Sequence, residues 1–274
     1  MTNHARAGNL EGSIPGDIAG NVLVAVPAAV GRRDAADDEN CSSGHSARRP
    51  SCPQPIPGAA AGGCAYDGSA ITLVPVADVA HLVHGPIGCL GNSWETRGSL
   101  SSGSTLHRRA FTTNLSEHDV IFGGEGTLRD AILDIGRRFR PPAVFVYLTC
   151  VPGLIGDDVE AVCRQSAAEL GLPVVPVLAA GFTGTKNAGN RLGGSALLTN
   201  VIGTAEPAYT TPYDVNLIGE YNIAGELWQV LPLLDRLGIR VLSKVSGDAR
   251  YAELTWAHRA KASMVVCSRA LLSL

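Results

Sequence analysis

The chain has few charged residues and no excess of either sign. Charged side chains make up 17% of its 274 residues, and the formal net charge is −3. This balance gives no reason to expect a nucleic acid or an anionic membrane as a partner. Hydrophobic residues reach 45%. A chain of this length and composition can bury a substantial core, and it fits a globular α/β protein with large interfaces.

A hydrophobic run long enough to cross a membrane is also missing from the sequence. The apolar stretch Val22–Val30 is too short, contains Pro27, and is followed by Arg32 and Arg33. No segment resembles an export signal. We therefore expect a cytoplasmic protein whose seven cysteines stay reduced, because disulfides persist in oxidising compartments. Such cysteines more often bind metal or lie buried.

The sequence lacks a Walker-type nucleotide loop. Residues 123–127 read Gly-Gly-Glu-Gly-Thr, without the lysine and the spacing of that motif. We therefore reject nucleotide binding at this turn. His107, Arg108 and Arg109 form a short basic cluster, which we interpret as a surface or subunit contact rather than a nucleic-acid site.

Three cysteines are the most informative residues present. Cys64 and Cys89 each follow a glycine, and Cys150 ends an apolar run that is typical of a buried strand. Glycine lets the backbone approach a bulky group closely. The cysteines are 25 and 61 residues apart, too far for one zinc knuckle. Iron–sulfur clusters are usually held by four cysteine thiolates, so three in one chain predict a cluster whose last ligand comes from a partner subunit.

Two regions are expected. Residues 1–57 are rich in Ala, Gly, Pro and Ser and have no sustained periodicity, which predicts a mobile leader. Cys41 and Cys52 lie in it, and we interpret both as incidental. Residues 58–274 are predicted to form an α/β region.

Strands and helices alternate in the second half of this region. The predicted strands are Ala143–Leu148, Pro173–Leu178, Val215–Ile218, Ile239–Val245 and Met264–Cys267. The helices between them are predicted after Asp157-Asp158 up to Gly171, at Gly193–Val201, at Ala224–Leu237, and from an Asp248 cap to about Arg259. This alternation predicts a doubly wound parallel sheet with helices on both faces.

Ligands of such sheets bind at the carboxyl ends of the strands. Cys150, Glu220, Asp248 and Cys267 all fall at those ends, although capping also explains the acidic residues and packing also explains Cys267. Leu271–Leu274 would begin a further helix, and we expect the chain to be truncated there.

Three other residues have simple structural interpretations. Cys163 is expected in the core, on the apolar face of a helix. His81 and His84 precede the Gly85-Pro86 turn and are expected to support the structure rather than bind metal.

These motifs, in this order, resemble the nitrogenase component 1 family, and most closely its members that act as scaffolds for assembly of the iron–molybdenum cofactor. The resemblance extends from about Gly58 to Leu274. It is carried by Ala61–Gly68, Asp78–Pro86, Gly91–Trp94, Thr149–Pro152, Ile155–Asp158, Gly184–Asn187, Asn216–Glu226 and Val266–Ser268.

The resemblance implies a heterotetramer of two such chains with two NifN-like chains. It implies that Cys64, Cys89 and Cys150 bind a permanent iron–sulfur cluster of the [4Fe–4S] type at the subunit interface. Cys267 matches the position that holds the cofactor in catalytic members, so it is a candidate anchor for a transient cofactor precursor. The NifH iron protein and a cluster donor protein are the further partners implied.

One local difference indicates a scaffold rather than an enzyme. Catalytic members of the family have a histidine where this chain has Asn190. Histidine can deliver protons near neutral pH, and asparagine cannot. Lys186 and Arg191 are cations available to a negatively charged cluster or organic acid. These residues favour holding a cluster over independent catalysis.

Two alternatives stay open at this point. The first is a catalytic nitrogenase α subunit or a related reductase such as the dark-operative protochlorophyllide enzyme. The second is a non-functional fragment that keeps the interfacial thiolates and holds no precursor, because the family continues beyond this length.

Overall fold

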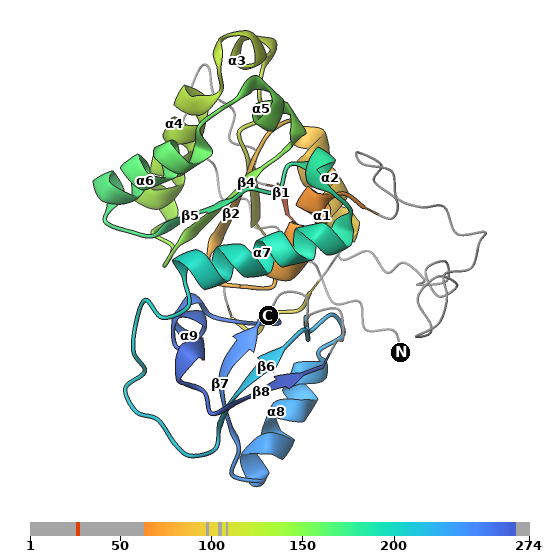
Figure 1. Cartoon of the computed structure of the whole chain (residues 1–274), viewed down its shortest axis with the longest axis vertical. Coiled ribbons are helices and arrows are strands. Elements are labelled where there is room, and N and C mark those ends of the chain that lie inside the picture. The colour runs from red at the N-terminus through yellow and green to blue at the C-terminus, as the bar shows by residue number, and fades with distance from the viewer. Residues whose placement is uncertain (1–25, 28–62, 97–98, 104–105, 108, 267–274) are drawn as a thin grey trace, which may run out of the picture.

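A computed structural model of the chain describes residues 26–27, 63–96, 99–103, 106–107 and 109–266. Its elements form two lobes, an upper one around a five-stranded sheet and a lower one around a three-stranded sheet (Figure 1). Most of the predicted leader, with Cys41 and Cys52, lies outside the described residues. Its described part is Val26–Pro27 (β1), which pairs antiparallel with β3 (Arg109–Thr112).

The first sheet has the strand order β1-β3-β2-β4-β5. Apart from β1 its strands run parallel, and they are β2 (Ala80–His84), β3, β4 (Val144–Leu148) and β5 (Val174–Val177). The predicted strand at Ala143–Leu148 is confirmed as central. Its Phe145 and Tyr147 lie in one core. Val144 and Val146 lie in the other, so the strand is apolar throughout because both faces are covered.

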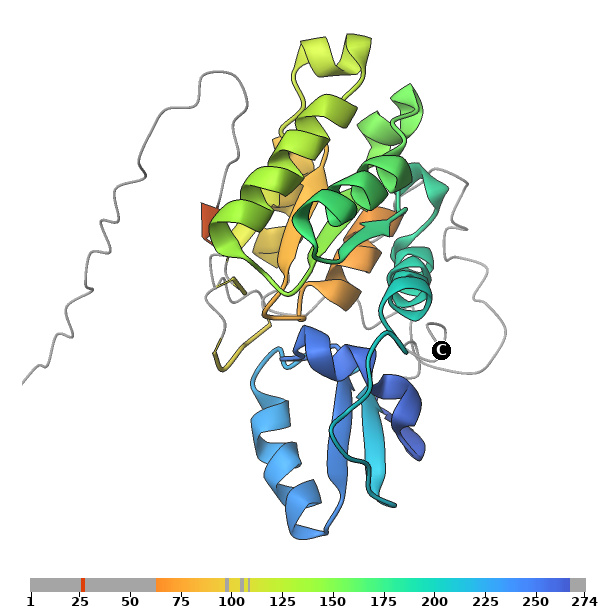
Figure 2. The same cartoon turned by 90° about the vertical axis from the view of Figure 1, so that its left-hand side faces the viewer.

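Helices cover both faces of this sheet, as predicted. One face carries α4 (Glu125–Phe139) and α6 (Val159–Leu170), and the other carries α1 (Ala65–Leu73), α2 (Ile87–Thr96) and α7 (Lys186–Asn200). Figure 2 shows α4 and α7 on opposite sides of the strands. The short helices α3 (Glu117–Phe122) and α5 (Cys150–Ile155) lie at the end of the upper lobe (Figure 1). No helix of the described residues is both long and apolar enough to span a bilayer.

The second sheet has the order β7-β6-β8, with all strands parallel. Its elements are β6 (Asp214–Ile218), α8 (Glu226–Arg236), β7 (Arg240–Val245), α9 (Tyr251–Thr255), the 3₁₀ helix η2 (Ala257–Arg259) and β8 (Ala262–Val265). The predicted α/β class is confirmed. The alternation of strands and helices in the sequence did not show that the strands form two separate sheets. In the structure the second sheet begins after α7.

One predicted helix cap was wrong. Asp248 does not begin a helix, since α9 starts at Tyr251 after Arg250. The carboxylate of Asp248 instead accepts hydrogen bonds from the Ser102 hydroxyl (2.8 Å) and the Trp228 indole (3.0 Å). Burial opposes ionisation of this carboxyl, but these donors outweigh it and lower its pKa to about 2. The side chain therefore ties the segment before β3 to the lower lobe.

The two lobes also meet at the segment between α1 and β2. The amide of Ala77 donates to the carbonyl of Ala249 (2.9 Å), and Asp78 accepts from the amide of Tyr251 (2.9 Å). The Ser246 hydroxyl donates to the carbonyl of Thr72. The end of β7 is thereby fixed against the end of α1.

The contact between α1 and α7 is made by glycines. A Cβ atom at Gly189 would overlap the carbonyl of Ala65, and one at Gly68 would overlap the carbonyl of Lys186. This packing also corrects the predicted start of the helix, which begins at Lys186 and not at Gly193. Glycine destabilises an isolated helix. In α7 the close packing against α1 compensates for this low helix propensity.

We expect Gly189→Ala to destabilise the fold by about 1–3 kcal/mol, because the added methyl group overpacks a backbone contact. The control is Gly126→Ala in α4, where a Cβ would meet nothing within 4 Å. That variant should be neutral or more stable by up to about 1 kcal/mol, since alanine favours helix. Urea unfolding measures both. Equal midpoints for the two variants would contradict the proposed packing.

Candidate metal centre

The structure brings the three predicted ligand cysteines to one end of the first sheet. Cys150 begins α5 directly after β4, and Cys89 lies in the first turn of α2, which follows β2. These strands are parallel neighbours, with His84 opposite Leu148, so their carboxyl ends lie together. Cys64 comes from elsewhere: it precedes α1 and pairs with Thr185 just before α7.

Gly181 lies between two of these sulfur atoms. A Cβ built on Gly181 would be 2.8 Å from Sγ of Cys150 and 3.1 Å from Sγ of Cys64. The two sulfurs are therefore no farther apart than the sum of these distances. Gly181 is buried and follows β5, the third parallel strand that ends here. A side chain at this position would fill the space that the two thiols face.

Cys89 completes the group. Burial raises the pKa of its thiol, and the neighbouring Cys150 and Cys64 raise it further, while the hydroxyl group of Thr149 acts in the opposite direction. Cys64 and Cys89 also pack against the same hydrophobic core. All three are free and partly exposed. Across the described residues, no three His, Cys, Asp or Glu side chains converge as ligands of a single metal ion.

The predicted polar residues of α7 have different surroundings. The amide of Lys186 donates to the carbonyl of Gly63 (2.9 Å), so this residue is beside Cys64. Asn190 is half-buried against α1, where its side-chain oxygen accepts from the Thr72 hydroxyl (3.5 Å). Arg191 is exposed. The structure therefore brings Lys186 to the cysteines and turns Asn190 toward the junction of the lobes.

Cys267 lies outside the described residues. The last described residue, Val266, donates its amide to the carbonyl of Ile218 (2.9 Å). This hydrogen bond continues the pairing of β6 with β8 at the carboxyl edge of the second sheet. Glu220 follows β6 at the same edge, and its carboxylate accepts from the amide of Asn222 (2.9 Å).

Both predicted structural histidines bind protein groups. His81 contacts the Tyr147 hydroxyl (2.9 Å) and the carbonyl of Val76 (3.0 Å), and burial lowers its pKa to about 4. It is therefore neutral at physiological pH. Nε2 of His84 lies 2.9 Å from Asp157, which also accepts from the amide of Gly124 (3.0 Å). The amide of Gly124 therefore already donates to a carboxylate of the protein, whereas a phosphate loop would leave its amides for the ligand. Cys163 is buried in the core, as expected.

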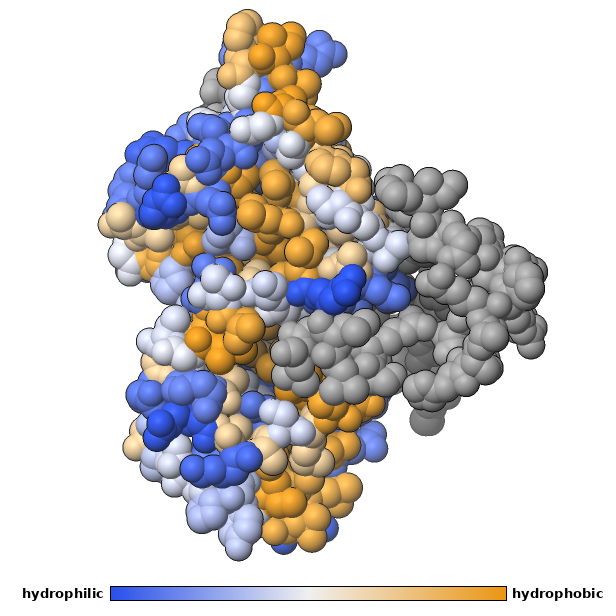
Figure 3. All heavy atoms as spheres, viewed as in Figure 1, coloured by the Kyte–Doolittle hydropathy of each residue, from blue (hydrophilic) through white to orange (hydrophobic). Residues whose placement is uncertain are grey.

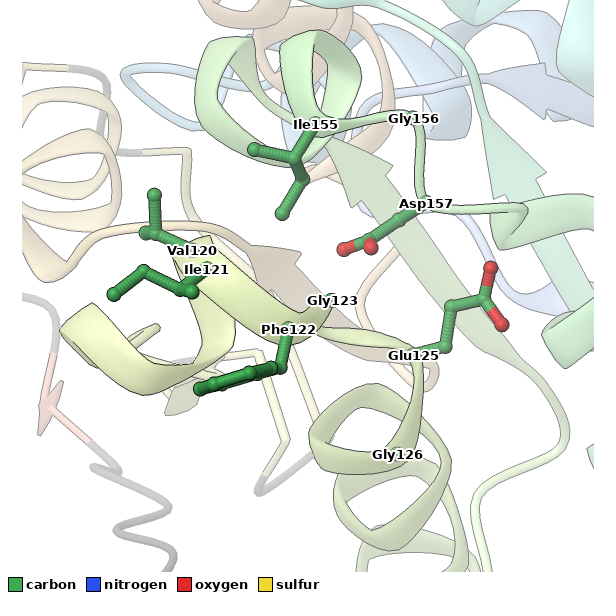
Figure 4. A pocket seen from close by; sticks show the side chains of 9 residues that line it. All are labelled: Val120, Ile121, Phe122, Gly123, Glu125, Gly126, Ile155, Gly156 and Asp157. Atoms are coloured by element: carbon green, nitrogen blue, oxygen red, sulfur yellow. The ribbon is translucent and has the colours of Figure 1, made fainter.

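A cavity of about 740 Å³ adjoins this network (Figure 4). It is lined by Val120, Ile121, Phe122, Gly123, Glu125, Gly126, Ile155, Gly156 and Asp157. Its side chains come from α3, the start of α4 and the end of α5. Sequence reasoning did not find the cavity, because it depends on how these short elements meet.

Sequence reasoning also missed two residues at the cysteines. Gly181 has no charged or metal-binding group, so only its position reveals its importance. Thr149 belongs to one of the family motifs, but the sequence pattern predicts no role for it. Its side chain is buried against Gly85, in the segment that leads to Cys89. Its place at the carboxyl end of a central strand was the available signal.

Comparison with known proteins identifies the class. The profile of nitrogenase component 1 type oxidoreductases matches residues 64–274. A solved structure described as nitrogenase Cp1 at pH 6.5 superimposes with a TM-score of 0.73 and 35% identity, covering 76% of this chain and 41% of the other. The chain belongs to the nitrogenase component 1 family, as its motifs predicted.

Within that family several curated relatives are named nitrogenase iron-molybdenum cofactor biosynthesis protein NifE. The relative from Nostoc sp. is 65% identical over 82% of this chain and 47% of its own length. The relative from Bradyrhizobium diazoefficiens is 56% identical over 86% of this chain and 43% of its own length. This agrees with the resemblance to the scaffold members. The chain spans about half the length of these relatives.

The raised pKa of Cys89 predicts a shifted alkylation profile. In metal-free protein its thiolate should form at a higher pH than an ordinary cysteine, whose pKa is about 8.5. Labelling with iodoacetamide across a pH series, read by peptide mass spectrometry, measures this. The same peptide in urea-unfolded chain is the control. A profile that does not change on unfolding would contradict the buried position.

Proposed function

We propose that this chain is part of a scaffold for assembly of the iron–molybdenum cofactor, in which Cys64, Cys89 and Cys150 bind one [4Fe–4S]-type cluster. The placement of the three cysteines at one end of the first sheet, with the sulfurs of Cys64 and Cys150 both against Gly181, carries this proposal. A cluster of several iron atoms is the group that cysteine thiolates from separate segments would accept. When bound, such a cluster supplies a one-electron centre and joins its ligands covalently.

The fourth ligand is expected from a NifN-like partner. Exposed apolar side chains flank the cysteine segments: Ile87 is 45% exposed, Leu154 74% and Phe182 42%. Hydrophobic residues gather at the end of the upper lobe that contains α3 and α5 (Figure 3). Apolar residues in such numbers beside unpaired thiols fit an interface with another subunit. Two chains of each kind would make the heterotetramer.

The cofactor precursor would bind at the junction of the lobes. Cys267 is the proposed anchor, because in the sequence it follows Val266, whose amide binds Ile218 at the carboxyl edge of the second sheet. Asn190 approaches the same junction through Thr72, whose carbonyl binds Ser246 at the end of β7. Lys186 and Arg191 add positive charge on α7 for a negatively charged cluster or organic acid.

This site is suited to temporary binding. One thiolate and a few polar side chains hold a cluster less firmly than a thiolate with a histidine ligand. Asn190 cannot titrate near pH 7, so it does not deliver protons as a catalytic histidine would. We propose that a NifH-like iron protein and a cluster donor supply the site, and that it works in the reducing cytoplasm. The higher identity to NifE proteins than to the solved nitrogenase chain supports a scaffold over a catalytic subunit.

Removal of one proposed ligand should remove the interfacial cluster. We expect the Cys150→Ala variant, co-expressed with the NifN-like partner, to lose most of the iron and sulfide of that cluster. We also expect its complex with the partner to be weaker. Cys163→Ala is the matched control, because Cys163 is buried in the other core. Iron and sulfide analysis of the purified complexes measures this. Unchanged iron content in Cys150→Ala would refute the ligand assignment.

The anchor can be tested separately from the cluster. Cys267→Ala should retain the interfacial iron but fail to keep precursor through gel filtration, since it loses the only thiolate proposed at that site. Two quantities are measured: the iron that the complex retains beyond that of the interfacial cluster, and the transfer of the precursor to apo-nitrogenase. Retention equal to that of the parent complex would show that the precursor is held elsewhere.

A further inference from the structure

Residues 99–103 lie in the sequence between α2 and β3 of the upper lobe, but they bind the lower lobe. The amide of Leu100 donates to the carbonyl of Asn222 (2.8 Å), and the side-chain amide of Asn222 donates to the carbonyl of Leu100 (2.8 Å). Near the other end of the segment, the amide (3.2 Å) and the hydroxyl group (2.8 Å) of Ser102 both donate to Asp248. We call residues 99–103 the strap.

The two residues that bind the strap are themselves held by the lower lobe. Asn222 is buried, and its side-chain oxygen accepts from the amide of Leu227 in the first turn of α8 (3.2 Å). Asp248 is also buried, and its carboxylate accepts from the Trp228 indole (3.0 Å) and from Arg250 (3.1 Å). Moving such side chains would cost the hydrogen bonds of several buried groups. The strap therefore binds a rigid surface.

That surface is the carboxyl edge of the second sheet. Asn222 follows β6, and Asp248 follows β7. The two loops touch, since the amide of Gly247 donates to the carbonyl of Glu220 (2.9 Å). β8 is paired with β6 in parallel and ends at the same edge. Ligands of parallel sheets bind at this edge, so the strap occupies part of the edge at which the precursor is proposed to bind.

We propose that the strap restrains the cofactor precursor at this edge, and that Asp248 is the positioning residue that holds the strap in place. This inference rests on the proposed function, because it assigns a role beside the same precursor site. Release of the precursor then requires the strap to detach from the lower lobe. The release rate is proportional to the detached fraction, so weakening the bonds between the strap and Asp248 increases it.

Two substitutions weaken this attachment. Asp248 has a positive φ of 45°, which asparagine adopts more readily than most residues, so Asp248→Asn keeps the backbone conformation. The groups of Ser102, Trp228 and Arg250 that bind the carboxylate are all donors, and an amide nitrogen in place of one oxygen cannot accept from them. Ser102→Ala is the milder variant, because it removes one hydroxyl donor from an exposed residue.

Each variant is prepared in the full-length complex with the NifN-like partner and loaded with a radioiron-labelled iron–sulfur precursor. Transfer of the label to excess apo-nitrogenase measures the release rate. We expect roughly tenfold faster release in Asp248→Asn, which corresponds to about 1.4 kcal/mol, and a smaller acceleration in Ser102→Ala. The iron of the interfacial cluster should not change. Thr211→Ala is the matched control, because its hydroxyl also donates to a carboxylate of the second sheet, that of Asp214 (2.5 Å), but at the amino end of β6.

Two outcomes would overturn the proposal. One is a parental release rate in both Asp248→Asn and Ser102→Ala. The other is an equal acceleration in Thr211→Ala, which would reveal a general loosening of the lower lobe. If Asp248→Asn does not fold, the comparison of Ser102→Ala with Thr211→Ala decides. A parent complex that takes up no precursor would instead contradict the proposed function, so the two failures can be told apart.

Discussion

The site depends on the close contact between α1 and α7. Gly68 and Gly189 let the two backbones approach to a distance that no larger residue would allow. This contact holds Cys64, at the start of α1, beside Gly181, which precedes α7. Because the helices are fixed by backbone packing rather than by long side chains, the position of Cys64 has little freedom. Rigid placement of ligands is what a permanent cluster requires.

Parallel strands supply the rest of the geometry. β2, β4 and β5 all end at the same edge, so the segments that carry Cys89, Cys150 and Gly181 begin there, and Gly181 lies against the sulfur of Cys150. The proposed precursor site uses the same rule at the carboxyl edge of the second sheet. The two proposed sites differ in surroundings. The three cysteines of the first are partly exposed on one lobe, whereas the second lies at a junction made by Thr72 and Ser246, which suits cargo that must enter and leave.

Much could be predicted from the sequence because several signals are local. The continuous apolar run before Cys150 required a strand buried on both faces, and β4 is such a strand. Asp158 caps α6 where the capping rule placed a helix start. The alternation of strands and helices determined the parallel arrangement. Of the glycines before Cys64 and Cys89, Gly63 lies in close contact with Asp67, whereas a Cβ at Gly88 would meet nothing within 4 Å. The family followed from motifs whose order did not depend on three-dimensional contacts.

What only the tertiary structure decided involves contacts between distant segments. Asp248 is bound by Ser102 and Trp228 and so cannot cap a helix, which no local pattern could show. The helix from Lys186 forms despite its glycines because α1 lies against them. The sequence by itself determined which residues carry sulfur and which segments from Ala143 onward are strands, whereas β2 and β3 were not predicted. The fold determined which sulfurs meet, since strand order and helix packing set distances that chain separation does not.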